Sequence, residues 1–281
     1  MSTIGKALSL LDTVSRLEEE AGLTDIARLC ALDKATTRRF LVELTRHGFV
    51  EQDPVTRKYR IGAAPVRLAR IREARYPFLS IALPHIKALA ETSAETVHLS
   101  EFAGGRLATI HVEDSPKAHR VIVDVGGILP FHATASGLAF LAFRPAGEIE
   151  AALASPLERF TEHTITDPAQ IGELLRETKA RGFSIGHQGF EIGVVSVAAP
   201  IRSPSGQPIG CIAVAAPTVR VGKTALQALG IEAVATAEAI SEQYYGLKRP
   251  VETNARPGNA DLGNARPGNA RPGNARLGRT G

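Results

Sequence analysis

Cysteine is scarce in this 281-residue sequence, and its two copies, Cys30 and Cys211, lie far apart in apolar stretches. Their spacing fits no metal-binding pattern, so we interpret both as buried free thiols in a reducing compartment. No run of about 18 apolar residues occurs, so we predict no membrane-spanning helix. The N-terminus lacks the basic start, short apolar core and small-residue cleavage site of a signal peptide, so we expect a cytoplasmic protein.

The small net charge of +4 is unevenly distributed along the chain. Residues 1–75 carry 14 Lys or Arg against 10 Asp or Glu, whereas residues 76–249 carry 14 against 17. A basic front piece joined to a mildly acidic body indicates an anion-binding N-terminal domain and a separate second domain.

The end of the chain is a five-residue repeat that reads NARPG, NADLG, NARPG, NARPG and NARLG from Asn254 to Gly278. Gly, Pro and Asn cannot bury enough apolar surface to offset the chain entropy, so we predict a disordered tail over 249–281. Weak contacts of its arginines with DNA stay open, although a dispensable extension is the simpler interpretation.

Residues 1–62 show the element order of a winged helix-turn-helix domain. Apolar residues recur with helical spacing over 4–20. Thr24 is placed to cap a second helix with Leu29 facing inward, and Asp33 to cap a third helix that ends at Gly48. Two short strands around an Asp-Pro turn then predict a β-hairpin.

The third predicted helix presents cations and hydroxyls in its first turns, where a recognition helix enters the major groove. Threonine suits phosphates or base edges, arginine suits guanine or phosphate, and the hairpin tip adds two further cations. The alternative is a charged helix face that only contacts solvent. The element order, the helix cap and the cations of the hairpin together favour binding to double-stranded DNA instead. The predicted DNA-binding residues are Thr24, Lys34, Thr36, Thr37, Arg38, Arg39, Arg57 and Lys58.

The sequence pattern of residues 63–248 predicts an α+β fold. Residues 63–80 indicate a linker helix, with breaks expected at Pro77 and Pro84, and residues 81–248 a second domain. Within it, strand patterns alternate with helical ones, and two strong strands at 193–202 and 209–217 are joined by a hairpin-type loop.

The stretch PFHATASGLAF, residues 130–140, combines small residues with hydroxyls, as a pocket for a small carboxylate requires. The start of its helix would offer free backbone N–H groups to the carboxylate, and His132 would pair with it. Residues of the neighbouring strands would form the floor of the pocket, and Phe183 would form one of its walls. Small residues that merely permit tight helix–sheet packing remain the alternative. The predicted effector-binding residues are His132, Ala133, Thr134, Ser136, Gly137, Phe183, His187, Glu191, Ser196, Ala213 and Ala215.

A serine hydrolase is the competing class, because Gly182 to Gly186 match G-x-S-x-G around Ser184. However, glycines interrupt the helix that should follow, and no His occurs after His187, so we disfavour catalysis. A phosphate loop at Gly222-Lys223-Thr224 lacks the required upstream glycine. Paired His and Glu on the strands lack a third metal ligand. We therefore predict no catalytic residues, no metal and no cofactor.

The stretches LTDIARLCALDKATTRRFLVELTRHGFVEQDPVTRKYRIG, LPFHATASGLAFLA and EIGVVSVAAPIRSPSGQPIGCIAVAAPTVRV resemble the IclR-type family of bacterial transcriptional regulators over about residues 3–247. The resemblance implies a GAF-like (profilin-like) effector-binding domain with an antiparallel sheet. It also implies a linker helix that helps the DNA-binding domains of two chains to dimerise, so that the protein is a homodimer or a dimer of dimers. The resemblance further implies a small-molecule effector, frequently an organic acid.

Within that family, HQGFEIGVVSVAAP is most similar to the aromatic-acid-catabolism branch. Gln188, Glu191 and Ser196 match its segment, whereas His187 replaces an Asp and Gly189 a Glu. We therefore predict a repressor or activator that binds a near-palindromic operator and responds to a small organic or aromatic acid, with ligand choice differing at His187.

Overall fold

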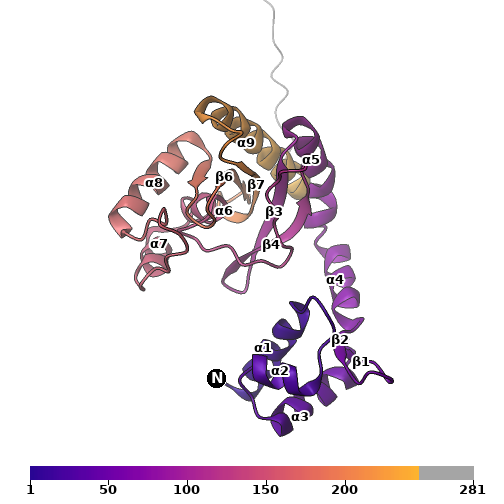
Figure 1. The fold of residues 1–281 in the computed structure, drawn as a ribbon. Helices are drawn as coiled ribbons and strands as arrows, with labels where there is room; N and C mark the ends of the chain where they lie inside the picture. The colour runs from indigo at the N-terminus through magenta and orange to yellow at the C-terminus, as the bar shows by residue number, and fades with distance from the viewer. Residues whose placement is uncertain (247–281) are drawn as a thin grey trace, which may run out of the picture. The chain divides into compact units, whose positions relative to one another are not determined.

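The computed structural model describes residues 1–246 (Figure 1), so the predicted disordered tail at 249–281 lies outside the described residues. No described helix is both long and apolar enough to cross a membrane. In chain order the elements are α1 (Thr3–Ser15), α2 (Leu23–Leu29), α3 (Lys34–Arg46), β1 (Val50–Gln52), β2 (Tyr59–Ile61), α4 (Ala64–Arg75), α5 (Phe78–Ser93), β3 (Thr96–Ala103), β4 (Arg106–Glu113), α6 (Ala135–Leu141), α7 (Ala146–Leu153), α8 (Pro168–Arg181), β5 (Ser184–His187), β6 (Val194–Arg202), β7 (Pro208–Pro217) and α9 (Lys223–Tyr245).

The N-terminal part of the chain, which we call the head, is a winged helix-turn-helix, as predicted. Its three helices and the β1–β2 hairpin share one core, in which β1 pairs antiparallel with β2 from Val50 opposite Ile61 to Gln52 opposite Tyr59. The core consists of Leu10, Val14, Ile26, Phe40, Leu41, Val50 and Tyr59.

Two details of the head differ from the sequence-based expectation. α1 ends at Ser15 rather than near residue 20, because three consecutive glutamates, 18–20, would oppose the negative C-terminal end of the helix dipole. Gly22 and not Thr24 is the N-cap of α2, and Leu29 is 55% exposed rather than inward. Thr24 is therefore an exposed residue of the first turn of α2.

The predicted cap of the third helix is confirmed. The Asp33 carboxylate accepts a hydrogen bond from the Thr36 backbone N–H at 2.8 Å, and this bond lowers the pKa of Asp33. The helix ends before Gly48, whose φ of +74° is the left-handed conformation that glycine adopts without steric cost.

Pro77 interrupts the helical segment after the head, but Pro84 does not. α4 ends at Arg75 and α5 begins at Phe78, with Pro84 inside α5. A proline in a helix interior costs about 3 kcal/mol. Burial of Phe78, Ala82, Ile86 and Leu89 on one face of α5 offsets that cost, at roughly 1.5–3 kcal/mol for each large side chain.

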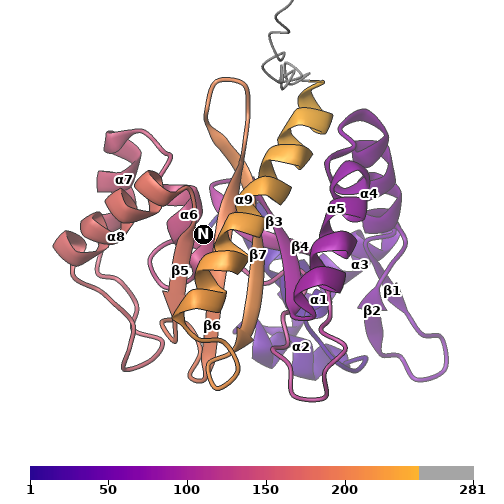
Figure 2. The ribbon, with the colours of Figure 1, turned by 90° about the horizontal axis from the view of Figure 1, so that it is seen from above.

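The second domain is built on a five-stranded antiparallel sheet with the order β4-β3-β7-β6-β5. α5 and α9 lie side by side over one face of this sheet (Figures 1 and 2). The strands turn large apolar side chains toward these two helices, namely Val97, Leu99, Val195, Val197, Ile212 and Val214.

The alternate positions of the same strands form the opposite face, because successive side chains of a strand point to opposite sides. This face carries small or polar residues in register: Thr96 opposite Ala215, His98 opposite Ala213, and Ser196 between Ala215 and Gly186. The short helix α6 packs on it through Ala135, Ala139 and Phe140. One sheet thus separates an apolar core from a face of small and polar groups.

An ion cluster around the buried carboxylate of Glu95 fixes the chain at the start of β3. The Arg220 guanidinium donates to both carboxylate oxygens of Glu95, at 2.7 and 2.6 Å, and Lys117 Nζ donates to one of them at 2.8 Å. Burial by itself would raise the pKa of Glu95, but these two cations outweigh it and lower that pKa.

This cluster predicts that Glu95→Gln lowers the stability of the fold at neutral pH and that the loss becomes smaller in acid. A carboxyl whose folded pKa is lowered stabilises the fold above its ordinary pKa, about 4.3, and ceases to do so as the pH falls through the folded value. We expect Glu95→Gln to lower the free energy of unfolding by about 2 kcal/mol at pH 7, with a smaller difference below about pH 4. Urea denaturation across this pH range measures it.

The matched control is Glu173→Gln, which removes a carboxylate from a solvent-exposed pair with Arg176. We expect that change to cost well under about 1 kcal/mol at any pH. Equal losses in the two variants at pH 7 would contradict a stabilising role for the cluster of Glu95, Lys117 and Arg220.

Candidate functional site

Helix α6 lies unusually close to the chain segment that precedes it. The Thr134 hydroxyl caps the helix by accepting from the Gly137 N–H at 2.9 Å, and it donates to the Pro130 carbonyl oxygen at 2.9 Å. A Cβ atom at Gly137 would lie 2.3 Å from that same carbonyl oxygen. Only glycine fits there, and the close approach holds the start of α6 against the backbone of Pro130 and Phe131.

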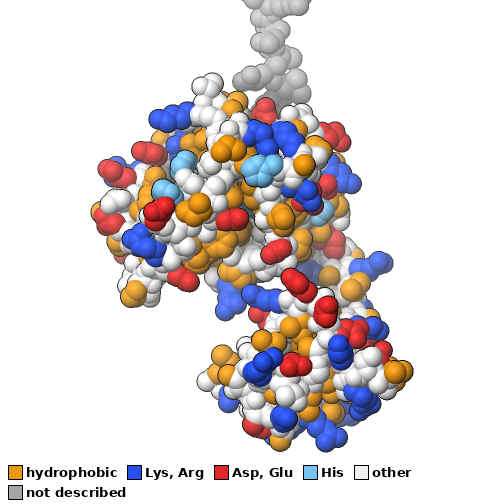
Figure 3. Space-filling view, viewed as in Figure 1, with side chains coloured by type: hydrophobic (Ala, Val, Ile, Leu, Met, Phe, Trp, Pro, Cys, Tyr) orange, Lys and Arg blue, Asp and Glu red, His pale blue; other side chains and the backbone are white. Residues whose placement is uncertain are grey.

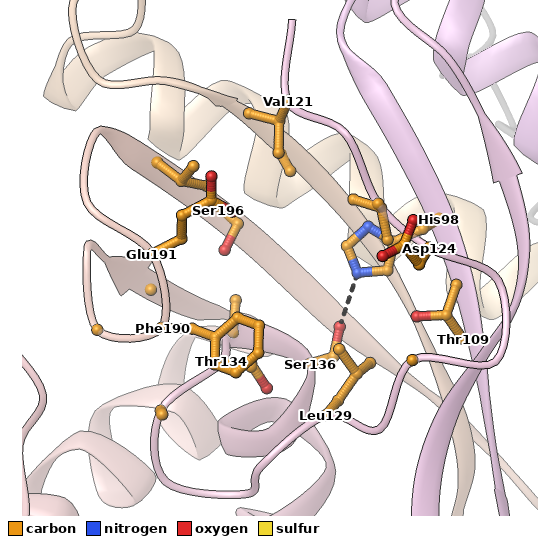
Figure 4. Close-up of a pocket in the computed structure, with 18 of the residues that line it drawn as sticks. His98, Thr109, Val121, Asp124, Leu129, Thr134, Ser136, Phe190, Glu191 and Ser196 are labelled. Carbon is orange, nitrogen blue, oxygen red and sulfur yellow. Dashed lines mark hydrogen bonds between the residues drawn. The ribbon is translucent and has the colours of Figure 1, made fainter. Parts of the chain in front are cut away.

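A cavity of about 260 Å³ opens beside the start of α6, over the small and polar face of the sheet (Figure 4). Its walls come from β3, β4, β6 and β7, from the segment between β4 and α6, and from the loop after β5. Among the residues that line it are His98, Thr109, Val121, Asp124, Leu129, Thr134, Ser136, Phe190, Glu191, Ser196 and Ala215.

The wall formed by residues 114–129 is tied by hydrogen bonds to the end of α5 and to strands β3 and β4. The Thr96 hydroxyl donates to the Val121 carbonyl at 2.7 Å, and the Ser115 hydroxyl to the Ala94 carbonyl at 2.8 Å. At the other end, backbone bonds join Thr109 to residues 126 and 127, and Leu129 to residue 107. We call this segment, residues 114–129, the strap.

The opposite wall is the loop at 188–193. Thr161 and Thr164 donate their hydroxyls to the carbonyls of Gln188 and Gly189, at 2.7 and 2.6 Å. The Gln188 side-chain oxygen accepts from the Gly193 N–H at 2.8 Å, which closes the loop on itself. The loop is thereby fixed against residues 161–164 rather than against the apolar core.

The electrostatics of the cavity are acidic to neutral. Asp124 and Glu191 line it, and none of its lining residues is a lysine or arginine. Burial lowers the pKa of His98 to about 4, so its imidazole is uncharged at neutral pH. A ligand in this cavity therefore meets hydroxyls, backbone groups and a neutral imidazole rather than a cation.

The structure brings six of the predicted effector-binding residues to this cavity: Ala133, Thr134, Ser136, Glu191, Ser196 and Ala215. Gly137 and Ala213 lie just behind the lining, in the close contact of α6 and in β7.

Three others lie elsewhere. His132 bonds the Glu158 carbonyl at 2.8 Å, His187 is exposed at the end of β5, and Phe183 packs on Gly230 of α9 across the sheet. Phe183 could not be placed from the sequence because the helix stop at Gly182 and the short strand β5 decide which side of the sheet it faces.

Several lining residues were not predicted, above all His98, Thr109 and Asp124. The alternation Thr96, His98, Ser100 in ETVHLSEF was a usable signal, because it places polar groups on one face of a strand that is otherwise apolar. Thr109 had no such signal. A β-bulge between β3 and β4 sets it opposite Ser100, and this register shift alone turns it toward the cavity.

Ser184, the centre of the G-x-S-x-G match, is a structural residue. Its side chain is fully buried, and its hydroxyl donates to the Ala135 carbonyl oxygen at 2.6 Å, which ties β5 to α6. No elbow geometry exists, since β6 rather than a helix follows β5. The serine hydrolase alternative is not supported.

The candidate DNA-binding face lies on α3 and the hairpin tip. Lys34, Arg38 and Arg39 are exposed on α3, and Arg57 and Lys58 are exposed on the hairpin. Figure 3 shows Lys and Arg side chains along the edge of the head where these elements lie.

Thr36 and Thr37 differ in their surroundings. Thr36 is half-buried, whereas Thr37 is fully buried and its hydroxyl donates to the Asp33 carbonyl at 2.8 Å. Thr37 therefore secures the first turn of α3 and is not available to contact DNA.

A winged helix-turn-helix joined to a domain with a ligand-sized cavity defines the class of ligand-responsive regulators of transcription. Comparisons with known proteins agree with this assignment to the regulators of transcription. The family described as IclR helix-turn-helix domain matches residues 3–54, and the family described as bacterial transcriptional regulator IclR C-terminal matches residues 74–242. The chain belongs to the IclR family of bacterial transcriptional regulators.

Relatives extend over most of the chain. The glycerol operon regulatory protein of Streptomyces coelicolor is 30% identical over 214 residues, 76% of this chain and 84% of that protein. The transcriptional repressor IclR of Escherichia coli is 26% identical over 251 residues, 88% of this chain and 92% of that protein.

Solved structures agree with the fold. An IclR transcriptional regulator from Silicibacter sp. TM1040 superimposes with a TM-score of 0.77 at 38% identity, covering 89% of this chain and 98% of that chain. An IclR homolog from Microbacterium hydrocarbonoxydans, complexed with 4-hydroxybenzoate, gives a TM-score of 0.73 at 24% identity. The match covers 87% of this chain and 100% of that chain.

The close approach of α6 predicts a large effect of one added methyl group. We expect Gly137→Ala to lower the free energy of unfolding by about 3 kcal/mol, because the new Cβ would overlap the Pro130 carbonyl and push the first turn of α6 away from residues 130 and 131. Thermal and urea denaturation measure the loss.

Gly172→Ala in α8 is the matched control, since no atom lies within 4 Å of the added Cβ. There the same change should stabilise the helix, by roughly 0.5–1 kcal/mol. A Gly137→Ala protein as stable as Gly172→Ala would refute the packing role assigned to Gly137.

Proposed function

We propose that the chain is a cytoplasmic regulator that binds a near-palindromic operator through α3 and the hairpin, under the control of a small organic molecule in the α6 cavity. The observation that carries the DNA-binding half is the exposed cationic face of α3. Asp33 fixes the start of that helix, and Lys34, Arg38 and Arg39 extend from its first turns into solvent. The proposed contacts also include Thr24, Thr36, Arg57 and Lys58.

A second copy of the chain fits this proposal, because a near-palindrome requires two heads. Helix α4 buries only Ala64 and leaves Val66, Leu68 and Ile71 between 44% and 57% exposed. Leu68 and Ile71, three positions apart, share one face of α4, and covering them with the same helix of a partner would remove apolar surface from water. We propose a homodimer, or a dimer of dimers, on this ground.

For the effector we propose a small organic or aromatic acid. The 4-hydroxybenzoate complex of the Microbacterium homolog and the name of the glycerol operon regulatory protein both fit a small oxygen-bearing molecule. An acid in this cavity would take its hydrogen bonds from hydroxyls such as those of Ser136 and Ser196 and from backbone N–H groups. Because Asp124 and Glu191 repel its charge, the carboxylate would lie away from them.

Coupling to the head would pass through the linker. Arg72 of α4 forms an ion pair with Glu101 of β3, and this contact raises the pKa of Arg72. β3 is also the strand that carries His98 in the cavity wall. An effector shifts the operator-binding equilibrium only through its different affinities for the two states, about 5.5 kcal/mol for a complete switch.

The recognition role of α3 predicts a selective loss in Arg38→Ala. We expect operator affinity, measured by gel shift on the upstream region of the protein's own gene, to fall about tenfold or more with the melting temperature unchanged. Arg176→Ala, which removes another exposed arginine, on α8, should bind as the wild type does. Unaltered binding by Arg38→Ala would exclude α3 as the recognition helix.

The hairpin predicts a change in salt dependence. If Lys58 neutralises one phosphate, Lys58→Ala should reduce the slope of log K against log salt concentration by about one unit, equally for operator and unrelated DNA. Fluorescence anisotropy at four salt concentrations measures the slope. An unchanged slope with lower operator affinity would instead place Lys58 on a base edge.

A further inference from the structure

Two buried polar atoms in the cavity wall have no hydrogen-bond partner. They are Nδ1 of His98 and Oγ1 of Thr109, in side chains that are 6% and 1% exposed. A third such atom among the described residues, Oγ1 of Thr178, belongs to α8 and is not part of the cavity lining. Buried polar groups are almost always hydrogen-bonded. Two unpaired polar atoms in one cavity wall therefore point to a ligand group that would pair with them, and we call these two atoms the orphans.

The two orphans lie on the same side of the cavity. Thr109 is opposite Ser100, and His98 precedes Ser100 by two positions, so both belong to one face of neighbouring strands. Figure 4 shows the His98 ring and the Thr109 hydroxyl on one side, with Glu191 and Phe190 on the other. The β-bulge that brings Thr109 to this face also places Leu107 opposite Phe102, in the apolar cluster under α6.

The side chains on this side of the cavity carry no positive charge. Nε2 of His98 lies 3.4 Å from the Ser136 hydroxyl, and the imidazole is uncharged at neutral pH. A neutral imidazole and a threonine hydroxyl can each donate or accept, and Asp124 beside them can only accept when ionised. Such a set matches a hydroxyl group, which both donates and accepts, and offers no positive charge to a carboxylate.

We propose that His98 and Thr109 select an effector that carries a hydroxyl group, which hydrogen-bonds to His98 Nδ1 and Thr109 Oγ1. This assignment rests on the proposed function of the cavity and narrows its ligand class. If the effector is an acid, it is a hydroxy acid whose hydroxyl lies against β3 and β4 and whose carboxylate lies away from both Asp124 and Glu191.

The test separates the hydroxyl from the carboxylate. Eight probes vary the two features independently: 4-hydroxybenzoate, benzoate, 4-hydroxybenzamide, benzamide, lactate, propionate, lactamide and propionamide. Binding to the full-length protein is measured by calorimetry at millimolar concentration. In at least one of the two scaffolds, the hydroxylated member should bind about tenfold more tightly than its hydroxyl-free partner, in the acid pair and in the amide pair alike.

Thr109→Val keeps the shape of the side chain and removes the orphan hydroxyl. It should fold at least as stably as the wild type and should reduce the preference for the hydroxylated probe to near equality. The matched control is Thr178→Val, the same change at an equally buried and unpartnered hydroxyl outside the cavity, which should keep the preference in full. His98→Gln, which retains a polar group toward Ser136, should weaken the preference as well.

The outcomes are distinct. Hydroxylated and hydroxyl-free probes that bind equally, with Thr109→Val unchanged, would mean that water satisfies the two atoms, and this overturns the assignment. So would a set in which no hydroxylated probe binds. Amides that bind as well as acids, with the hydroxyl preference intact and lost in Thr109→Val, would support the assignment while removing the acid class from the proposed function.

Discussion

The period-2 alternation of one antiparallel sheet is the constraint on which the rest of the second domain depends. Val97, Leu99, Ile212 and Val214 face α5 and α9, while the residues between them are small or polar and face α6. Large side chains on both faces would give a two-sided core with no room for a ligand. Because the second face is small, a single short helix covers part of it and the uncovered part is the cavity.

Polar contacts, besides apolar ones such as that of Phe190 with Phe160, hold the two outer walls of that cavity. The strap begins at the cluster of Glu95, Lys117 and Arg220, and the loop at 188–193 depends on the hydroxyls of Thr161 and Thr164. Walls of this kind open locally at lower free energy than core strands do. A ligand that bridges them would add contacts which the free protein lacks, and such differential contacts are what an effector needs in order to shift a conformational equilibrium.

Local signals predicted most of the head and less of the cavity. The Asp33 cap, the stop at Gly48 and the hairpin follow from residues adjacent in sequence, and the structure confirms them. Thr37 shows the limit of such reasoning, since its spacing in α3 matches that of contact residues while its hydroxyl is used within the helix. Phe183 and Thr109 were beyond local reasoning, because a short edge strand and a β-bulge decide the faces on which they lie.

The stretch around Ser184 shows how one spacing serves two architectures. In a nucleophile elbow the small residues flanking the serine permit a sharp turn that exposes it. Here Gly186 permits contact with Ala135 and Ser196, where a Cβ would lie 3.0 and 3.1 Å from their atoms, and Ser184 donates inward to α6. The same small residues that suggested catalysis thus bring β5 against α6. That contact sets the position of the helix start, and with it the wall of the cavity from which Ser136 faces His98.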